Sequence, residues 1–318
     1  MKFSEISQES KLYFFSVLTA LFVTFLWSTS FVVIKIGLKT ATPMLFSGLR
    51  YLLASIILLS LVAFNGTSKR ELKSLQRNHF FLLVAYGLIF ITMTQGFQYL
   101  SLNLLPAITV SQLLTITPVL VLLMSNFILK EIPSRFDFIL LATTLFGVFL
   151  YYYPFQIPYS ELLGLGFLVI CLLSNAGSTI LGRHINSTLH KSPLTVTSIS
   201  MFFGGLILTI AGFIFEKFTF SALEMFYVIL LAVVNTAFAF TLWNKTMKTL
   251  RALDTSLINN TMLPQITILS IIFLQEMVTL VELVSLVIIL VSVMSIQVHS
   301  ILKQNNNNNK KNVVPALS

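Results

Sequence analysis

TPMLFSGLRYLLASIIL, residues 42–58, aligns without gaps with SPLTVTSISMFFGGLIL, residues 192–208, so that Pro43 coincides with Pro193. Each stretch opens an apolar run of about 20 residues, which is the length that crosses the hydrocarbon core of a bilayer as a helix. Proline is favoured in the first turn of a helix, so the two prolines mark equivalent helix starts. The chain therefore holds at least two related helices of membrane length.

A second match joins residues 105–131 to residues 250–276 and pairs Glu131 with Glu276. Apolar sequence produces chance matches between leucines and alanines, so the proline and glutamate pairs carry the comparison. Together the two matches predict that the chain is an internal duplication, with each half contributing the same order of helices.

The composition agrees with a membrane protein. Of the 318 residues, 56% are hydrophobic and only 10% are charged, and the mean hydropathy is +0.90. Soluble domains carry roughly 25% charged residues, so the composition argues against a water-soluble fold. The net charge of +9 does not indicate nucleic-acid binding, because the basic residues lie at the ends of apolar runs. The single cysteine, Cys171, offers neither a disulfide nor a cysteine-based metal site.

The apolar runs predict an all-α integral membrane fold with ten transmembrane helices. The spans are expected near residues 12–36, 42–64, 79–99, 105–128, 136–153, 162–182, 195–215, 222–243, 253–274 and 279–298. We assign residues 12–155 to a first repeat of five spans and residues 160–298 to a second. Residues 1–11 form a short N-terminal segment without a cleavage pattern, and the asparagine-rich residues 303–318 predict a disordered tail.

The distribution of basic residues predicts the orientation. The two termini and the loops after spans 2, 4, 6 and 8 hold sixteen lysines and arginines, whereas the other loops hold three. Basic residues stay preferentially on the cytoplasmic side, so both termini are expected in the cytoplasm, with the protein in the plasma membrane. Because each half has five spans, the second half enters the membrane in the opposite sense. The halves are therefore expected to be inverted repeats around a central cavity, an arrangement common in secondary transporters.

The sequence resembles the two EamA domains of the drug/metabolite transporter superfamily. The resemblance rests on residues 25–54 (FLWSTSFVVIKIGLKTATPMLFSGLRYLLA), on Pro118 followed by LKE at residues 129–131, and on Pro264 followed by LQE at residues 274–276. It covers residues 14–297. It implies a ten-helix inverted-repeat fold whose cavity is lined mainly by spans 1, 3, 4, 6, 8 and 9, and members export amino acids, purines, drugs or other metabolites, while some take solutes up.

The chain departs from the family pattern at two positions. The family often has glycine before the glutamate that ends spans 4 and 9, whereas this chain has Lys130 and Gln275. The turns at these two places are therefore expected to differ from those of other members.

Polar and aromatic residues on the predicted lining spans are the candidate cavity residues. Gln95, Gln98 and Tyr99 have the spacing that places them on one helix face. The full set is Trp27, Ser28, Ser30, Lys35, Gln95, Gln98, Tyr99, Gln112, Thr115, Asn175, Asn235, Trp243, Asn259 and Asn260. Each could instead serve helix packing, and as a set they predict a largely neutral cavity for a small polar or amphipathic solute.

Four charged residues in or beside the predicted spans are candidate functional residues. Arg50 is seven residues beyond Pro43, about 10 Å into span 2; it could attract an anionic substrate or hold neighbouring helices. Lys35 could reach the surface water or face the cavity mouth. Glu131 and Glu276 are candidates for proton coupling, and the alternative is that they anchor helix ends.

The predicted function is secondary transport of small metabolites, with export expected. Uptake by the same fold and a non-transporting scaffold are the alternatives. The sequence contains neither the residue clusters of an intramembrane enzyme nor a GxxxxGK[ST] phosphate loop, so we expect no enzymatic activity. The expected partners are a small-molecule substrate and the lipid bilayer; proton coupling is left open, and no cofactor, metal or nucleic acid is expected.

Overall fold

The computed structural model describes residues 8–129, 135–153, 158–189, 191–217, 221–246, 249–250 and 258–313, and the regular elements in them are helices. The first half comprises α1 (Gln8–Gly37), α2 (Pro43–Phe64), α3 (Gly66–Lys73), α4 (Arg77–Gly87), η2 (Leu88–Gln95), α5 (Gly96–Leu104), α6 (Ala107–Leu114), α7 (Thr117–Leu129) and α8 (Arg135–Tyr152). The second comprises α9 (Tyr159–Leu189), α10 (Pro193–Phe215), α11 (Ala222–Leu230), η3 (Leu231–Phe238), α12 (Ala239–Thr246), α14 (Met262–Leu269), η4 (Ser270–Leu274) and α15 (Leu280–Val313).

Among the described residues, six helical segments are long and apolar enough to cross a membrane. They are Lys11–Gly37, Pro43–Phe64, Arg77–Leu104, Tyr159–Gly182, Pro193–Phe215 and Ala222–Thr246. Four shorter apolar helices are Ala107–Val121, Phe138–Tyr152, Ile258–Leu274 and Leu280–Ser295. The chain is thus a multi-pass membrane protein. The total of ten spans stays a prediction, because these four are shorter than the roughly 20 residues that a crossing needs.

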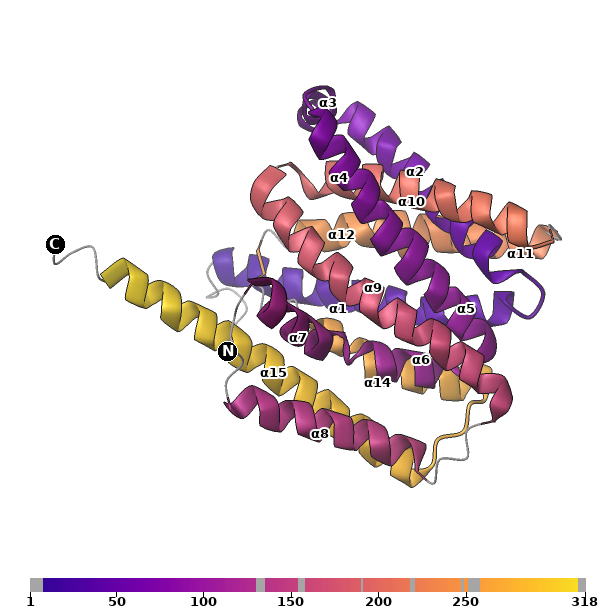
Figure 1. Ribbon diagram of the computed structural model, residues 1–318. Coiled ribbons are helices and arrows are strands. Elements are labelled where there is room, and N and C mark those ends of the chain that lie inside the picture. The colour runs from indigo at the N-terminus through magenta and orange to yellow at the C-terminus, as the bar shows by residue number, and fades with distance from the viewer. Residues whose placement is uncertain are drawn as a thin grey trace.

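Helices α2 and α10, which the sequence alignment matches, lie side by side and run antiparallel (Figure 1). A Cβ atom added to Gly48 would lie 2.7 Å from the backbone nitrogen of Thr209, and one added to Gly205 would lie 2.7 Å from that of Leu52. From the first contact to the second, the residue number rises from 48 to 52 in α2 and falls from 209 to 205 in α10, so the two helices run in opposite directions. Only glycine allows backbones to approach this closely. Their antiparallel packing fits the inverted two-repeat architecture.

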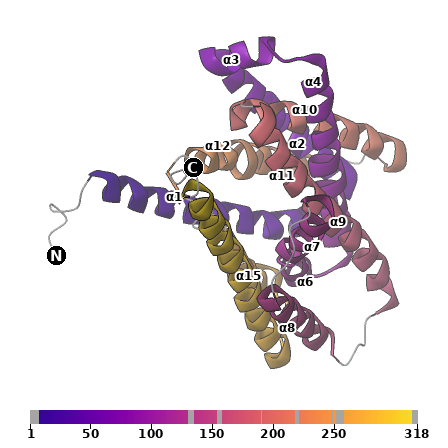
Figure 2. The same ribbon diagram turned by 60° about the vertical axis from the view of Figure 1, so that its left-hand side comes forward.

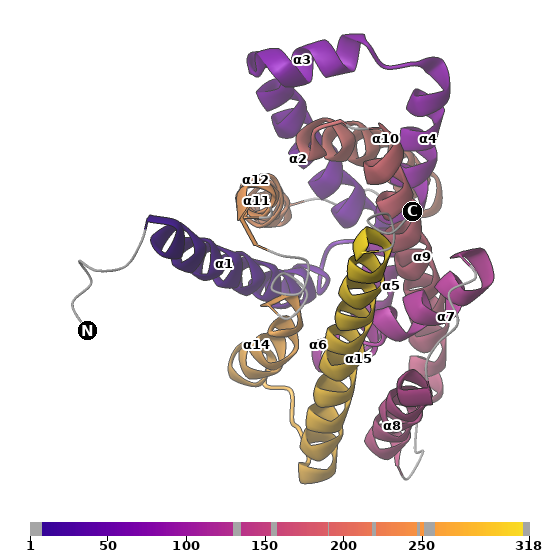
Figure 3. The ribbon, with the colours of Figure 1, turned by 90° about the vertical axis from the view of Figure 1, so that its left-hand side faces the viewer.

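Helices α8 and α15 form a second antiparallel pair. A Cβ atom on Gly147 would lie 2.7 Å from the Ile289 side chain, and the rings of Phe136 and His299 are 4.9 Å apart. The pair lies beside α7 and away from α2 and α10 in both turned views (Figure 2, Figure 3). The fifth and tenth predicted spans therefore also meet in opposite directions.

The fourth and ninth predicted spans are interrupted rather than continuous. The helix breaks between α6 and α7 at Thr115 and Ile116, two residues before Pro118, and again at Thr261, three residues before Pro264. Proline removes a backbone donor and crowds the preceding turn, which explains both breaks. At the first break, the hydroxyl of Thr117 donates to the carbonyl oxygen of Leu114 at 2.7 Å and so satisfies one carbonyl there.

The third and eighth predicted spans each contain a stretch of wider helical turns. These are η2 and η3, and each holds a buried threonine whose hydroxyl donates to the carbonyl five residues earlier. Thr94 bonds to Ile89 at 2.9 Å and Thr236 bonds to Leu231 at 2.8 Å. Wide turns of this kind are rare and occur often at functional sites. Figure 3 looks along α11 and α12, which continue as one rod through η3.

Helix α15 extends the last apolar segment to Val313. The composition of residues 303–318 predicted a disordered tail, whereas the structure describes helix as far as residue 313. A helix that is already nucleated adds further residues at little cost, which is a physical reason for the continuation.

Candidate functional site

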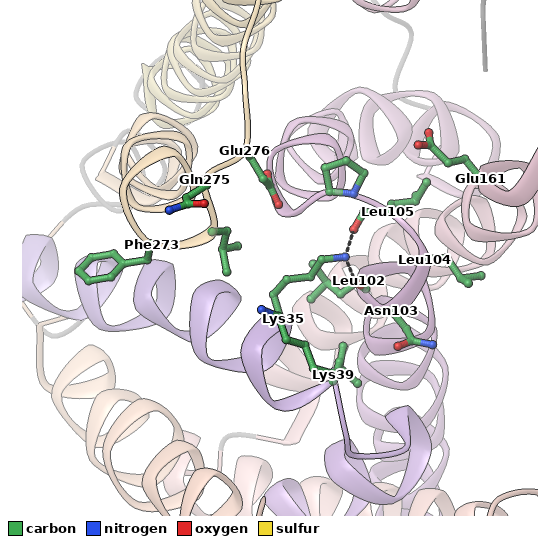
Figure 4. A pocket seen from close by; sticks show the side chains of 13 residues that line it. Lys35, Lys39, Leu102, Asn103, Leu104, Leu105, Glu161, Phe273, Gln275 and Glu276 are labelled. Atoms are coloured by element: carbon green, nitrogen blue, oxygen red, sulfur yellow. Dashed lines mark hydrogen bonds between the residues drawn. The ribbon is translucent and has the colours of Figure 1, made fainter. Parts of the chain in front are cut away.

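A pocket of about 730 Å³ lies where the end of α1 meets the connection between α5 and α6 (Figure 4). It is lined by Lys35, Leu38, Lys39, Leu102, Asn103, Leu104, Leu105, Pro106, Glu161, Phe273, Leu274, Gln275 and Glu276. These residues come from the end of α1, the end of α5 and its connection to α6, the start of α9, and the end of η4 with the residues after it. Both halves of the chain therefore contribute to the pocket, and four of its side chains are charged.

Lys35 reaches from the last turn of α1 to the end of α5. Its ammonium group donates to the carbonyl oxygens of Leu102 and Leu105, both at 2.6 Å (Figure 4). The last carbonyls of a helix have no partner within the helix and carry partial negative charge, so a cation is favourable there. Of the two expectations for Lys35, the structure therefore supports a position in the pocket rather than extension into surface water.

Glu276 caps the start of α6 from the second half of the chain. Its two carboxylate oxygens accept the backbone N–H groups of Ala107 at 2.7 Å and Ile108 at 3.0 Å. These are the first residues of the helix, where an anion is stabilised by unpaired donors and by the helix dipole. Glu276 thus anchors a helix end, which was one of its two predicted roles. The other candidate, Glu131, lies outside the described residues.

The residue before Glu276 has an unusual backbone conformation. Gln275 has φ 56° and ψ 31°, and among the described residues no other non-glycine residue has a positive φ. This is the left-handed region that glycine occupies without steric cost. The family departure at Gln275 therefore falls where glycine would suit the backbone best. Lys130, the matching departure, is not among the described residues.

Lys35 and Glu276 bind the two helix ends that meet at the connection between α5 and α6. Lys35 neutralises the carbonyl end of α5, and Glu276 neutralises the amide end of α6. In the part of the chain that the structure describes, no carboxylate lies within 4.0 Å of a lysine or arginine nitrogen, and neither Lys39 nor Glu161 forms a side-chain hydrogen bond. Glu161 interacts with Lys35 through charge at a longer distance, and both Lys39 and Glu161 line the pocket that a solute would enter.

Arg50 lies away from this pocket, buried between three spans. Its Nε donates to the hydroxyl of Thr236 at 2.9 Å and its Nη1 donates to the hydroxyl of Tyr99 at 3.0 Å. Its guanidinium also lies 5.1 Å from the centre of the Tyr51 ring. Tyr51 in turn donates to Oε1 of Gln95 at 2.7 Å. Arg50 thus ties α2 to α5 and η3, which favours the structural role.

Other predicted cavity residues join α1 to the second half. The hydroxyl of Ser28 donates to Oε1 of Gln265 on α14 at 2.9 Å. The side chain of Asn235 on η3 donates to the carbonyl of Leu26 and, at 3.0 Å, to the hydroxyl of Thr29. Such amide and hydroxyl contacts are the usual polar links between membrane helices. Ser28 and Asn235 therefore make packing contacts between helices in this structure.

Aromatic side chains form the contact between α1 and α12. The Trp27 ring lies 5.4 Å from that of Phe240 and 5.1 Å from that of Trp243. On the opposite side, the amide of Asn175 on α9 donates to the hydroxyl of Thr117 at 3.1 Å. The predicted set is thus divided among several helix contacts, and only Lys35 of that set lines the charged pocket.

The remaining candidates differ in their surroundings. Gln112 is 1% exposed, and neither its amide oxygen nor its amide nitrogen has a hydrogen-bond partner. Ser30 and Thr115 bond to carbonyls of their own helices, at 3.3 and 2.9 Å. Gln98 and Asn260 are buried, whereas Asn259 is exposed. A buried amide without a partner is costly, so the unsatisfied amide of Gln112 sets it apart from Ser30 and Thr115, whose hydroxyl groups are satisfied.

Four polar residues of the pocket were not in the candidate set: Lys39, Asn103, Glu161 and Gln275. Each lies at the end or beginning of a predicted span on the surface that the charge count places outside the cell. If the polar residues at the span ends had been sorted by the membrane surface on which they are predicted to lie, these four would have formed one group. The described residues contain no group of three or more His, Cys, Asp or Glu side chains that could hold a metal ion.

Comparisons with known proteins now place the chain. One solved structure, titled "Crystal structure of protein", superposes with a TM-score of 0.63 at 16% sequence identity, over 87% of this chain and 94% of that chain. At this identity the likeness supports the fold alone. No curated protein sequence matches the chain. The model of the EamA-like transporter family matches residues 14–153 and again residues 162–297. Since these matches cover most of the sequence, the chain belongs to the EamA-like transporter family, and it is a membrane transporter of the drug/metabolite type.

Proposed function

We propose that the protein is a secondary carrier that exports small polar or amphipathic solutes by alternating access. The observation that carries this proposal is the charged pocket at the end of α1, where both halves of the chain meet. A solute that leaves between the halves passes such a pocket when they separate at this surface. The basic residues predict that this surface lies outside the cell, and the export that the resemblance favours would release the solute there.

The chemistry of the pocket favours solutes that carry both polar and apolar parts. Lys39 and Glu161 offer charges of opposite sign, Asn103 offers an amide, and Leu38 and Phe273 offer apolar surface. Away from this pocket, the buried amide of Gln112 has both its donor nitrogen and its acceptor oxygen unpaired. A solute with neutral or compensated charge fits these groups better than a simple anion or cation.

Transport is best tested in liposomes that contain the purified protein. A panel of amino acids, nucleobases and cationic drugs is supplied with and without a proton gradient, and exchange is measured against each solute inside. We expect at least one solute to move. If none moves by exchange or under the gradient, the carrier proposal is wrong and a non-transporting scaffold becomes the better explanation.

The pocket is tested by a matched pair of lysine variants. Lys35→Gln removes the cation that holds the α5 carbonyls, so we expect it to lower the transport rate. Lys69→Gln removes an exposed lysine of α3, far from the pocket, and should leave the rate unchanged. Equal rates for both variants, with equal amounts of folded protein, would count against the pocket as part of the transport path.

A further inference from the structure

Two carboxylates at the pocket end of the molecule join the two halves in the same manner. Glu216 follows α10 and accepts the backbone N–H groups of Met44 at 2.8 Å and Leu45 at 2.9 Å, at the start of α2. Glu276 follows η4 and accepts the first two N–H groups of α6 at 2.7 and 3.0 Å. Each contact crosses between the halves, but only Glu276 lines the pocket.

The α2–α10 pair is also fastened at its opposite end. Glu71 accepts hydrogen bonds from the backbone and hydroxyl of Ser192, at 3.0 and 2.7 Å, and from the hydroxyl of Thr195 at 2.8 Å. Between the two ends, glycines bring the helix backbones into contact. This pair cannot part at either surface without losing a carboxylate contact and close backbone packing. An opening at the pocket surface must therefore form elsewhere.

The Glu276 side of the pocket is built differently. Glu276 belongs to Gln275–Thr279, a connection without regular secondary structure between η4 and α15. This connection can shift without unfolding a helix. Gln275 is held in the left-handed conformation, and release of Glu276 would let it return to a more favourable one. Figure 4 shows Glu276 facing the pocket across from Lys35, beside the connection between α5 and α6.

We infer that the contact of Glu276 with Ala107 and Ile108 is a gate, which separates the pocket from the interior of the carrier and opens when the carboxylate leaves α6. The inference rests on the proposed transport function, whose two halves must part at this surface. The α2–α10 pair remains closed and acts as the axis of the movement. Glu276 then has two roles: it holds the start of α6 in the closed state, and its release from α6 opens the gate.

The gate is tested by the access of a thiol reagent to the interior. Ser28 is fully buried on α1, seven residues before Lys35 and so about 10 Å from it along the helix axis. Ser28→Cys is made in a Cys171→Ser background, and a membrane-impermeant maleimide is applied from each side of the membrane in turn. Lys39→Cys, exposed at the end of α1, reports which side faces the pocket.

Glu276→Gln and Glu216→Gln are compared in this background. An amide has one acceptor oxygen and no charge, so each variant loses one of two equivalent bonds to a helix start. We expect Glu276→Gln to raise the labelling rate at position 28 from the pocket side by about tenfold, the shift that about 1.4 kcal/mol of lost bonding produces. Glu216→Gln should leave that rate unchanged.

A rise in both variants, or in neither, would overturn the gate. If Glu276→Gln yields too little folded protein, Glu276→Asp keeps the charge on a shorter side chain and should give a smaller rise from the same side. Labelling needs no substrate, so the gate can fail while transport is present. Absence of transport with a rise specific to Glu276 would instead count against the proposed function alone.

Discussion

At the scale of single residues, the charged side chains decide how the helices are joined. Arg50, Lys35, Glu71, Glu216 and Glu276 each bond to backbone or neutral polar groups rather than to an opposite charge. A buried charge is costly unless such partners satisfy it. These residues therefore fix helix ends and crossings, and their removal affects the fold as well as transport.

Arg50 gives the first prediction. Arg50→Gln removes the hydrogen bonds to Thr236 and Tyr99, so we expect the free energy of unfolding to fall by about 1–3 kcal/mol. Thermal unfolding of the purified protein, followed by the loss of its monodisperse peak, measures this change. A variant that is as stable as the wild type but fails to transport would show instead that Arg50 acts on the substrate.

Gln275 gives a prediction of the opposite sign. Gln275→Gly removes the steric cost of the left-handed conformation, which is about 1–2 kcal/mol, against an entropic cost of about 0.5–1 kcal/mol for glycine. We expect a net gain in the free energy of unfolding of up to about 1.5 kcal/mol, measured by thermal unfolding. Gln275→Ala keeps a Cβ atom and should show no such gain, so a gain in both variants would contradict the explanation.

At the scale of elements, the α2–α10 contact depends on small residues. A Cβ atom on Gly205 would lie 2.7 Å from the backbone nitrogen of Leu52, which cannot move aside as a side chain can. We expect Gly205→Ala to destabilise the protein by at least about 1–3 kcal/mol. Gly177 in α9 has open space around its Cβ position, and Gly177→Ala should be neutral or stabilising. Thermal unfolding of both variants makes the comparison.

The Glu71 contact at the far end of the same pair predicts a dependence on pH. Burial disfavours the charged form of Glu71, but hydrogen bonds from Ser192 and Thr195, together with nearby Lys191, outweigh it and lower the pKa of Glu71. A lowered pKa in the folded state stabilises the fold above the ordinary value of about 4.3, and this stabilisation is lost as the pH falls through the lowered pKa.

The wild type should therefore be more stable than Glu71→Gln at pH 7, and the difference should shrink below about pH 4. Unfolding temperatures of both proteins across this pH range provide the measurement. A difference that stays constant with pH would show that the charge of Glu71 does not contribute.

At the scale of the whole molecule, the basic residues predict how the protein is oriented in the membrane. Sixteen of the 20 basic residues lie on the side that the spans assign to both termini. A reporter fused after Ser318 should therefore be active only when it functions in the cytoplasm. Activity restricted to the cell exterior would reverse the orientation, and the charged pocket would then face the cytoplasm.

The sequence by itself determined the features that are local along the chain. Apolar runs located the membrane segments, Pro43 and Pro193 marked equivalent helix starts, and the matched halves indicated the family that the comparisons confirm. The breaks before Pro118 and Pro264 could also have been foreseen, since proline acts on its own helix turn. Each of these signals lies within a few residues of the structure that it specifies.

Only the tertiary structure decided which distant groups meet. Glu276 lies 169 residues from Ala107, and Arg50 lies 186 residues from Thr236. Hydropathy and helix propensity predict which segments form membrane helices. They do not predict which face of a helix packs against another helix. Polar side chains on the lining spans therefore looked alike in the sequence, although packing turned most of them into helix contacts. The charged pocket exists because folding brings together the ends of α1, α5 and η4, the start of α9 and the connection between α5 and α6.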